Sequence, residues 1–132
     1  MSNDANVYAK MGVQTGVMSA SPHKLIVMLF DGALTSVRLA RLHMECGNVT
    51  EKCEAISKAV DIIQNGLWAA LDMEQGGEVA QGLEQLYDRM VTQLLNANLR
   101  NEPQLLDEVE GLLENIASAW REIAPQAAGE GA

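Results

Sequence analysis

The stretch SPHKLIVMLFDGALTSVRLARLHMECG, residues 21–47, decides the fold because it combines a helix start, one apolar stripe and a helix stop. The Ser21 hydroxyl can accept from the free amides of a first helical turn, and Pro22 is tolerated at the first helical position. Apolar residues then recur at alternating spacings of four and three, which places them on one helix face. They are Ile26, Phe30, Ala33, Val37, Ala40 and Met44. Gly47 follows as the type of residue at which helices commonly end.

The rest of the chain repeats this pattern. Each later apolar stripe stops at a turn signal, which is Gly76-Gly77, the segment 98–103 or Pro125. Connections of roughly three to six residues cannot carry the chain back along a bundle, so consecutive helices must be antiparallel. The sequence therefore predicts an all-α fold, an antiparallel up-down four-helix bundle over residues 21–124. Its helices are expected at about 21–46, 50–74, 78–99 and 102–124.

The two ends of the chain lack the helical pattern. Gly12 and Gly16 interrupt residues 1–20, whose apolar side chains are scattered among small and polar ones. We predict a flexible N-terminal arm or cap there. Residues 125–132 begin with a proline and are otherwise small and polar, so they are predicted to form a disordered tail.

Composition and charge limit the class of protein. The chain has 132 residues, enough for one domain, and its 48 % apolar content is too high for a disordered protein. A formal charge of −9 opposes non-specific attraction to nucleic acid or anionic lipid, so neither is an expected partner. Residues 1–66 sum to zero charge, while the acidic run Glu102–Glu114 carries five carboxylates and no base. That run is either a solvated acidic face or a docking face for a basic partner.

Motifs for catalysis or cofactor binding are not found in the sequence. Cys46 and Cys53 stand seven residues apart, which matches no zinc, haem or redox motif. Alanine lies three residues before both His23 and His43, whereas a di-iron bundle needs Glu-x-x-His. We therefore expect no enzyme activity, no catalytic or metal-binding residues and no cofactor. With no secretion signal and no run approaching about 18 apolar residues, a cytoplasmic protein that does not insert into a membrane is expected.

The helices carry more apolar residues than one core requires. Any one of them can widen the core, but as a set they indicate an exposed groove for a partner. The predicted groove residues are Leu25, Leu29, Ile62, Trp68, Tyr87, Val91 and Leu95. Apolar residues of the N-terminal arm, such as Val13, can occupy this groove when no partner is bound. The same surface leaves two states open for the free protein, a monomer or a weak homodimer.

Several blocks of the sequence resemble one known family. Residues 19–33, SASPHKLIVMLFDGA, resemble the opening signature of the flagellin export chaperones of the FliS family. The similarity continues through LDMEQGGEVA at 71–80 and ANLRN at 97–101, and it reaches VEGLL at 109–113. The blocks occur along most of the chain in the same order, and the resemblance covers roughly Tyr8 to Pro125.

The resemblance implies a function as well as a fold. It implies a cytoplasmic four-helix bundle that binds the disordered C-terminal segment of flagellin, prevents premature polymerisation and aids delivery to the flagellar type III export gate protein FlhA. Some members of the family also bind a flagellar anti-sigma factor. Tyr8 matches the tyrosine of the family's N-terminal arm, which covers a client groove and takes part in gate recognition. An alternative is a helical regulatory or assembly adaptor that binds another amphipathic partner.

Overall fold

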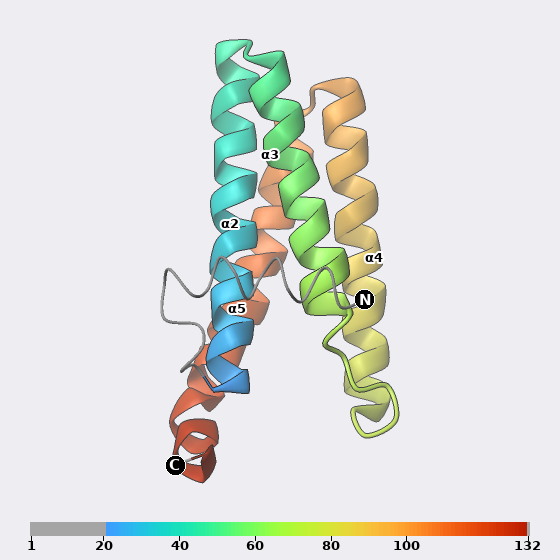
Figure 1. Cartoon of the computed structure of the whole chain (residues 1–132). Coiled ribbons are helices and arrows are strands. Elements are labelled where there is room, and N and C mark those ends of the chain that lie inside the picture. The colour runs from blue at the N-terminus through green and yellow to red at the C-terminus, as the bar shows by residue number, and fades with distance from the viewer. Residues whose placement is uncertain (1–20, 132) are drawn as a thin grey trace.

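The computed structural model describes residues 21–131, with side chains for residues 21–123. Within this part the chain is helical and carries no strand. Its elements are α2 (Pro22–Cys46), α3 (Val49–Asp61), the π-helical segment η2 (Ile62–Trp68), α4 (Gly77–Arg100) and α5 (Pro103–Gly131). Because η2 follows α3 directly, the two form one continuous helical rod (Figure 1).

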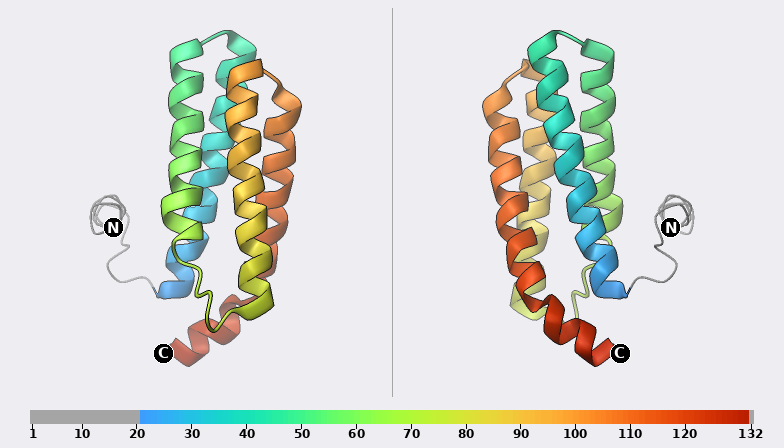
Figure 2. Two further views of the ribbon diagram at one scale, coloured as in Figure 1. Left: turned by 90° about the vertical axis from the view of Figure 1, so that its right-hand side faces the viewer. Right: turned by 90° about the vertical axis from the view of Figure 1, so that its left-hand side faces the viewer.

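The four rods form an up-down bundle. Consecutive rods run in opposite directions, as the colour sequence in Figures 1 and 2 shows. The α3–η2 rod and α5 each pack against both α2 and α4, so every rod touches the next one around the bundle. The prediction of an all-α, antiparallel four-helix bundle is confirmed.

The first rod begins and ends at the predicted sequence signals. The Ser21 hydroxyl oxygen accepts from the Lys24 amide at 3.1 Å, and Pro22 occupies the first turn. Gly47 ends α2 in the left-handed region with φ of 74°, where glycine has no Cβ to clash. The turn from α4 to α5 uses Asn101 at φ of 53°, because asparagine tolerates this conformation better than most residues.

The core is one apolar cluster to which all four rods contribute. Its largest fully buried side chains include Phe30 of α2, Ile63 of η2, Met90 of α4 and Leu113 of α5. Full burial of a side chain of this size stabilises the fold by roughly 1.5–3 kcal/mol. The stripe predicted for α2 is buried from Phe30 to Ala40, so the apolar pattern identified the inner face of this helix correctly.

The second helix is shorter than predicted and is not α-helical throughout. The sequence predicts a helix over 50–74, whereas the rod becomes π-helical in η2 and ends at Trp68. The backbone turns directly after Trp68, whose carbonyl accepts from the Leu71 amide at 3.1 Å. The Asp72 carboxylate then holds the next residues in a turn, since its Oδ1 accepts from the amides of Glu74 and Gln75 at 3.1 and 3.0 Å. A local turn of this kind competes with the helical hydrogen bonds that the same backbone would make.

The last helix is longer than predicted. The sequence predicts its end at residue 124, before Pro125, whereas α5 continues to Gly131. Proline has a helical φ, so a helix can pass through it, although one hydrogen bond is lost and the ring crowds the carbonyl four residues earlier. The predicted disordered tail, residues 125–132, thus overlaps the end of α5. The predicted N-terminal arm, residues 1–20, lies outside the described residues. In the described part of the chain, none of the helices combines the length and the apolar character needed to cross a membrane.

Candidate partner-binding surface

Four of the predicted groove residues reach the surface of the bundle. Leu25 and Leu29 on α2 are half-buried, as is Trp68 at the end of η2. Leu95 on α4 is 54 % exposed. These four come from three different elements, so half-buried or exposed apolar side chains occur on more than one helix.

The other three predicted groove residues, Ile62, Tyr87 and Val91, belong to the core instead. Val91 is only 7 % exposed, and burial raises the pKa of Tyr87 to about 12. The physical reason is that α4 and the α3–η2 rod each pack against two neighbours, which widens the buried arc beyond a single stripe. These three residues cannot contact a partner unless the bundle repacks. Tyr8 and Val13 lie outside the described residues.

Leu29 lies where α2 meets η2, and Leu25 precedes it by one turn on the same face of α2. A methyl group added to Gly66 of η2 would stand 3.0 Å from Leu29 Cδ2, so Leu29 packs directly on the backbone of η2. Gly32, one turn further along α2, has Ile62 Cδ1 at 3.4 Å from the corresponding position. The close contact makes this surface a half-buried apolar edge.

A longer apolar surface lies between the α3–η2 rod and α4. Trp68 Nε1 donates to Glu84 Oε2 at 3.1 Å, and Cys53 Sγ donates to Asn98 Oδ1 at 3.4 Å. These two bonds show which face of α4 is turned towards α3 and η2. Leu95 follows Glu84 by eleven residues and precedes Asn98 by three, which places it on the same helix face. Leu95 therefore lies between the two contacts.

This surface has a half-buried floor and an exposed rim. Val60, seven residues after Cys53 on α3, packs against the core, and Trp68 does the same. Leu95 forms the rim together with Leu99, which is 80 % exposed. We call Cys53, Val60, Trp68, Leu95 and Leu99 the α3–α4 strip. The predicted groove residues include Trp68 and Leu95 but not Cys53, Val60 or Leu99, although the four-residue step from Leu95 is a signal that finds Leu99.

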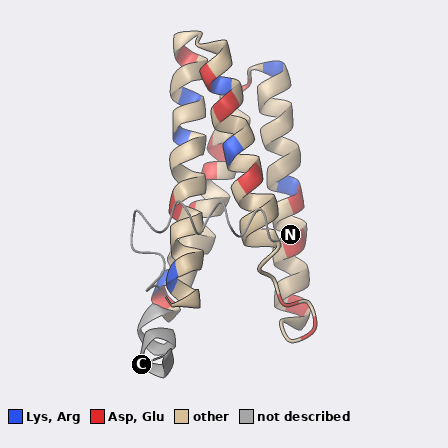
Figure 3. Cartoon of the chain, viewed as in Figure 1, with Lys and Arg blue, Asp and Glu red and all other residues tan. Residues whose placement is uncertain are grey.

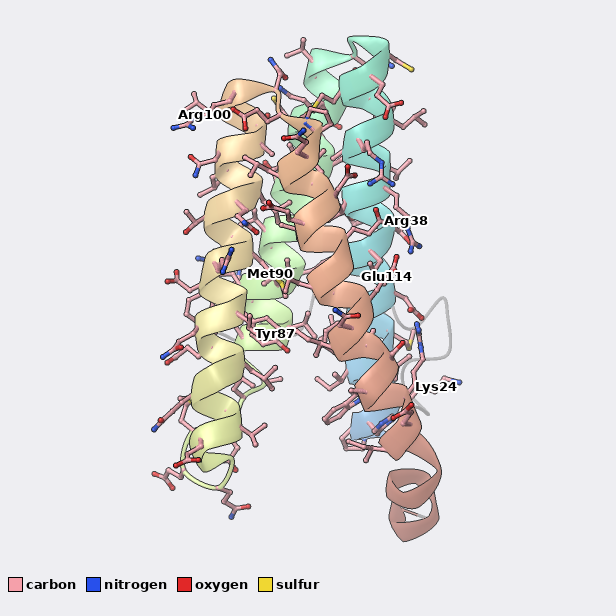
Figure 4. All side chains as sticks on the ribbon, turned by 180° about the vertical axis from the view of Figure 1, so that it is seen from behind. Lys24, Arg38, Tyr87, Met90, Arg100 and Glu114 are labelled. Carbon is pink, nitrogen blue, oxygen red and sulfur yellow. The ribbon has the colours of Figure 1, made fainter. Side chains whose placement is uncertain are left out.

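The face between α2 and α5 is polar and ion-paired. Arg38 Nε donates to Glu110 Oε2 at 2.6 Å, and Arg38 Nη2 donates to Glu114 Oε1 at 2.9 Å (Figure 4). Arg41 Nη1 donates to Glu110 Oε1 at 2.5 Å and to Asp107 Oδ1 at 2.7 Å. Much of the acidic run therefore joins α5 to α2, a use that neither sequence interpretation included.

A shallow pocket of about 400 Å³ lies on this same polar face. Its lining includes Asp31, Arg38, Glu114 and Arg121, and Arg121 is paired with Asp31. Among the described residues, no three His, Cys, Asp or Glu side chains are grouped so that they could hold a metal ion. The apolar strip and the charged pocket thus lie on different faces of the bundle.

Glu110 is expected to make stability depend on pH. Hydrogen bonds from Arg41 and then Arg38 outweigh burial and hold the pKa of Glu110 below its usual value. A lowered folded-state pKa stabilises the fold above the unfolded-state pKa, and this contribution is lost as pH falls through the folded-state pKa. We expect Glu110→Gln to lower the free energy of unfolding by about 1.5 kcal/mol at neutral pH, and by less below about pH 4.

Urea unfolding of the wild type and the variant at neutral and acidic pH measures this difference. Glu114→Gln is the control, because the Glu114 side chain is 52 % exposed and should contribute less than about 0.5 kcal/mol. A loss at Glu110 that does not change with pH would contradict the assignment.

Comparison with known proteins adds independent information. The model of a family described as Flagellar protein FliS matches residues 4–127. The chain is 58 % identical over 120 residues to the flagellar secretion chaperone FliS of Salmonella typhimurium, covering 91 % of this chain and 89 % of the relative. Against FliS of Escherichia coli the identity is 49 % over 115 residues, covering 87 % and 85 %. Against FliS of Bacillus subtilis it is 32 % over 109 residues, covering 83 % and 80 %.

Proposed function

This chain belongs to the FliS family of flagellar secretion chaperones, and from that premise we propose that its client is the disordered C-terminal segment of flagellin. In this role the protein works in the cytoplasm and keeps newly made flagellin from polymerising early. It then aids delivery of the client to the export gate protein FlhA. A flagellar anti-sigma factor is a further candidate partner, because some members of the family bind one.

The observation that carries the proposal is the α3–α4 strip. From Glu84, which binds Trp68, to Leu99 the strip follows fifteen residues of α4, or about 22 Å. A disordered segment loses conformational entropy when it binds, so it needs a long apolar contact to offset that loss. The exposed leucines of the rim offer such a contact in the free chain.

Two further parts of the chain extend the proposed site. The apolar edge at Leu25 and Leu29, on the α2 side of η2, is proposed as a second contact for the client. Tyr8 and Val13 of the N-terminal arm are proposed to cover the site in the absence of client, as the resemblance to the family implies. Tyr8 is also proposed to take part in recognition of the gate protein.

The proposed client site is tested by Leu95→Ser. We expect this substitution to weaken binding of the flagellin C-terminal segment by about tenfold, because the serine cannot replace the apolar contact of Leu95. Calorimetry with the full chain and the flagellin segment measures the affinity. The unsubstituted chain should bind with one-to-one stoichiometry and a strongly negative heat-capacity change.

Leu42→Ser is the matched control. Leu42 on α2 is 52 % exposed, close to the 54 % of Leu95, but it lies outside the strip. Both variants should melt like the wild type, since exposed substitutions away from the core usually change stability little. Equal loss of binding in the two variants would argue against the strip as the site. Absence of binding by the unsubstituted chain would reject flagellin as the client.

A further inference from the structure

The first turns of α4 carry a partly exposed apolar face that is separate from the α3–α4 strip. Val79 is 72 % exposed, Gly82 is exposed, and Leu86 is half-buried with part of its side chain against the core. Steps of three and four residues place all three on one helix face. Leu86 precedes Gln93 by seven residues, and Gln93 Nε2 donates to Glu108 Oε2 of α5 at 2.7 Å. This face of α4, formed by Val79, Gly82 and Leu86, is therefore turned towards the α5 side.

Neither backbone conformation nor lack of space requires a glycine at position 82 in the free chain. Gly82 lies inside α4 without a positive φ, and a methyl group added there would meet nothing within 4 Å. Glycine weakens a helix relative to alanine, so the isolated bundle would be more stable with alanine at this position. A glycine between two apolar residues does, however, allow another backbone to approach closely.

The charge around this face is acidic and is not neutralised by nearby bases. Residues 69–88 contain five carboxylates and no lysine or arginine, as Figure 3 shows along α4 and the loop before it. Asp107, Glu110 and Glu114 of α5 are ion-paired with α2, but within the described residues no ion pair involves the carboxylates of 69–88. Glu74 and Glu78 are exposed next to Val79, and the nearest base along α4 is Arg89. The charge next to this face of α4 is therefore acidic near Val79 and becomes basic at Arg89, one turn after Leu86.

We propose that Val79, Gly82 and Leu86 form a docking face for an amphipathic helix of a partner protein whose basic residues flank its apolar stripe. The apolar stripe packs on Val79 and Leu86, and the glycine lets the two helices approach. The bases of the partner pair with Glu74 and Glu78. Because this face points to the α5 side and the strip to the α3 side, a client and this partner can be bound at the same time. The inference does not depend on which client occupies the strip.

The test uses a synthetic peptide of leucine and lysine, with leucines at helical spacings of three and four, and a twin in which glutamate replaces lysine. Binding to the full chain is measured by calorimetry at low ionic strength. Gly82→Ala should weaken binding of the lysine peptide by about tenfold, because the added methyl group blocks close approach. Val79→Ser should weaken it by a similar factor.

Matched controls distinguish an effect at the docking face from a general effect of the substitution on helix stability. Gly111 of α5 is also an exposed helical glycine with nothing within 4 Å of an added methyl group, so Gly111→Ala should raise the melting temperature as Gly82→Ala does. It should not change peptide binding, and neither should Leu99→Ser.

The proposal is overturned if the lysine peptide does not bind, if the glutamate twin binds equally, or if Gly111→Ala weakens binding as much as Gly82→Ala. It is also overturned if the face pairs with a second copy of the chain, shown by a dimer that Val79→Ser dissociates.

Discussion

Val91→Lys is expected to lower the free energy of unfolding by about 3 kcal/mol, enough to unfold much of a marginally stable bundle. Val91 is 7 % exposed and belongs to the same core cluster as Met90 and Leu94. A lysine there must either bury its ammonium group without a partner or push α4 away from its neighbours. Urea unfolding followed by circular dichroism measures the loss.

Leu95→Lys is the matched control, because Leu95 lies one helical turn after Val91 and is 54 % exposed. Its ammonium group stays in water, so the free energy of unfolding should stay within about 0.5 kcal/mol of the wild type. The two variants thus distinguish a buried core position, Val91, from an exposed position of the α3–α4 strip, Leu95. If both variants unfolded at the wild-type urea concentration, Val91 would have to be a surface residue.

Local signals in the sequence were sufficient to predict where the first helix begins and ends. The cap at Ser21 and the left-handed Gly47 depend only on residues within one turn. The turn that precedes α4 also has a local signal, the Asp72 carboxylate, which accepts from the amides of Glu74 and Gln75. The apolar stripe of this helix continues past Trp68 to Ala70, so spacing alone predicts a longer helix than the structure has.

Contacts between helices could not be predicted from local signals, because they depend on how the rods are placed beside one another. Val91 and Leu95 both lie beside the core stripe, and spacing alone does not show which of them a neighbouring rod covers. Arg38 and Glu110 are 72 residues apart in the chain, so their pairing follows only from the placement of α2 beside α5. Ile62, Tyr87 and Val91 are therefore buried by neighbouring rods, and the binding role of the other predicted groove residues stays a prediction.

The second large effect is expected where α5 holds the start of α2. The rings of His23 and Trp120 are stacked, with centroids 4.8 Å apart and planes 8° apart. Trp120 Nε1 donates to the His23 carbonyl at 3.2 Å, and His23 Nε2 lies 2.8 Å from the Trp120 carbonyl. Trp120→Ala removes the ring contact and the indole donor together, so it should lower the free energy of unfolding by about 3 kcal/mol.

Trp120→Phe separates the two contributions, because phenylalanine keeps a ring for stacking and loses only the indole donor. Its expected loss is about 1 kcal/mol. Ile123→Ala, in the next turn of α5 and 49 % exposed, should cost less than either. The Trp120 contact also holds the turn that precedes Leu25, so hydrogen exchange in Trp120→Ala should rise first at the start of α2 and later at Phe30. A uniform rise along α2 would mean that the contact stabilises the whole bundle and does not specifically anchor the start of this helix.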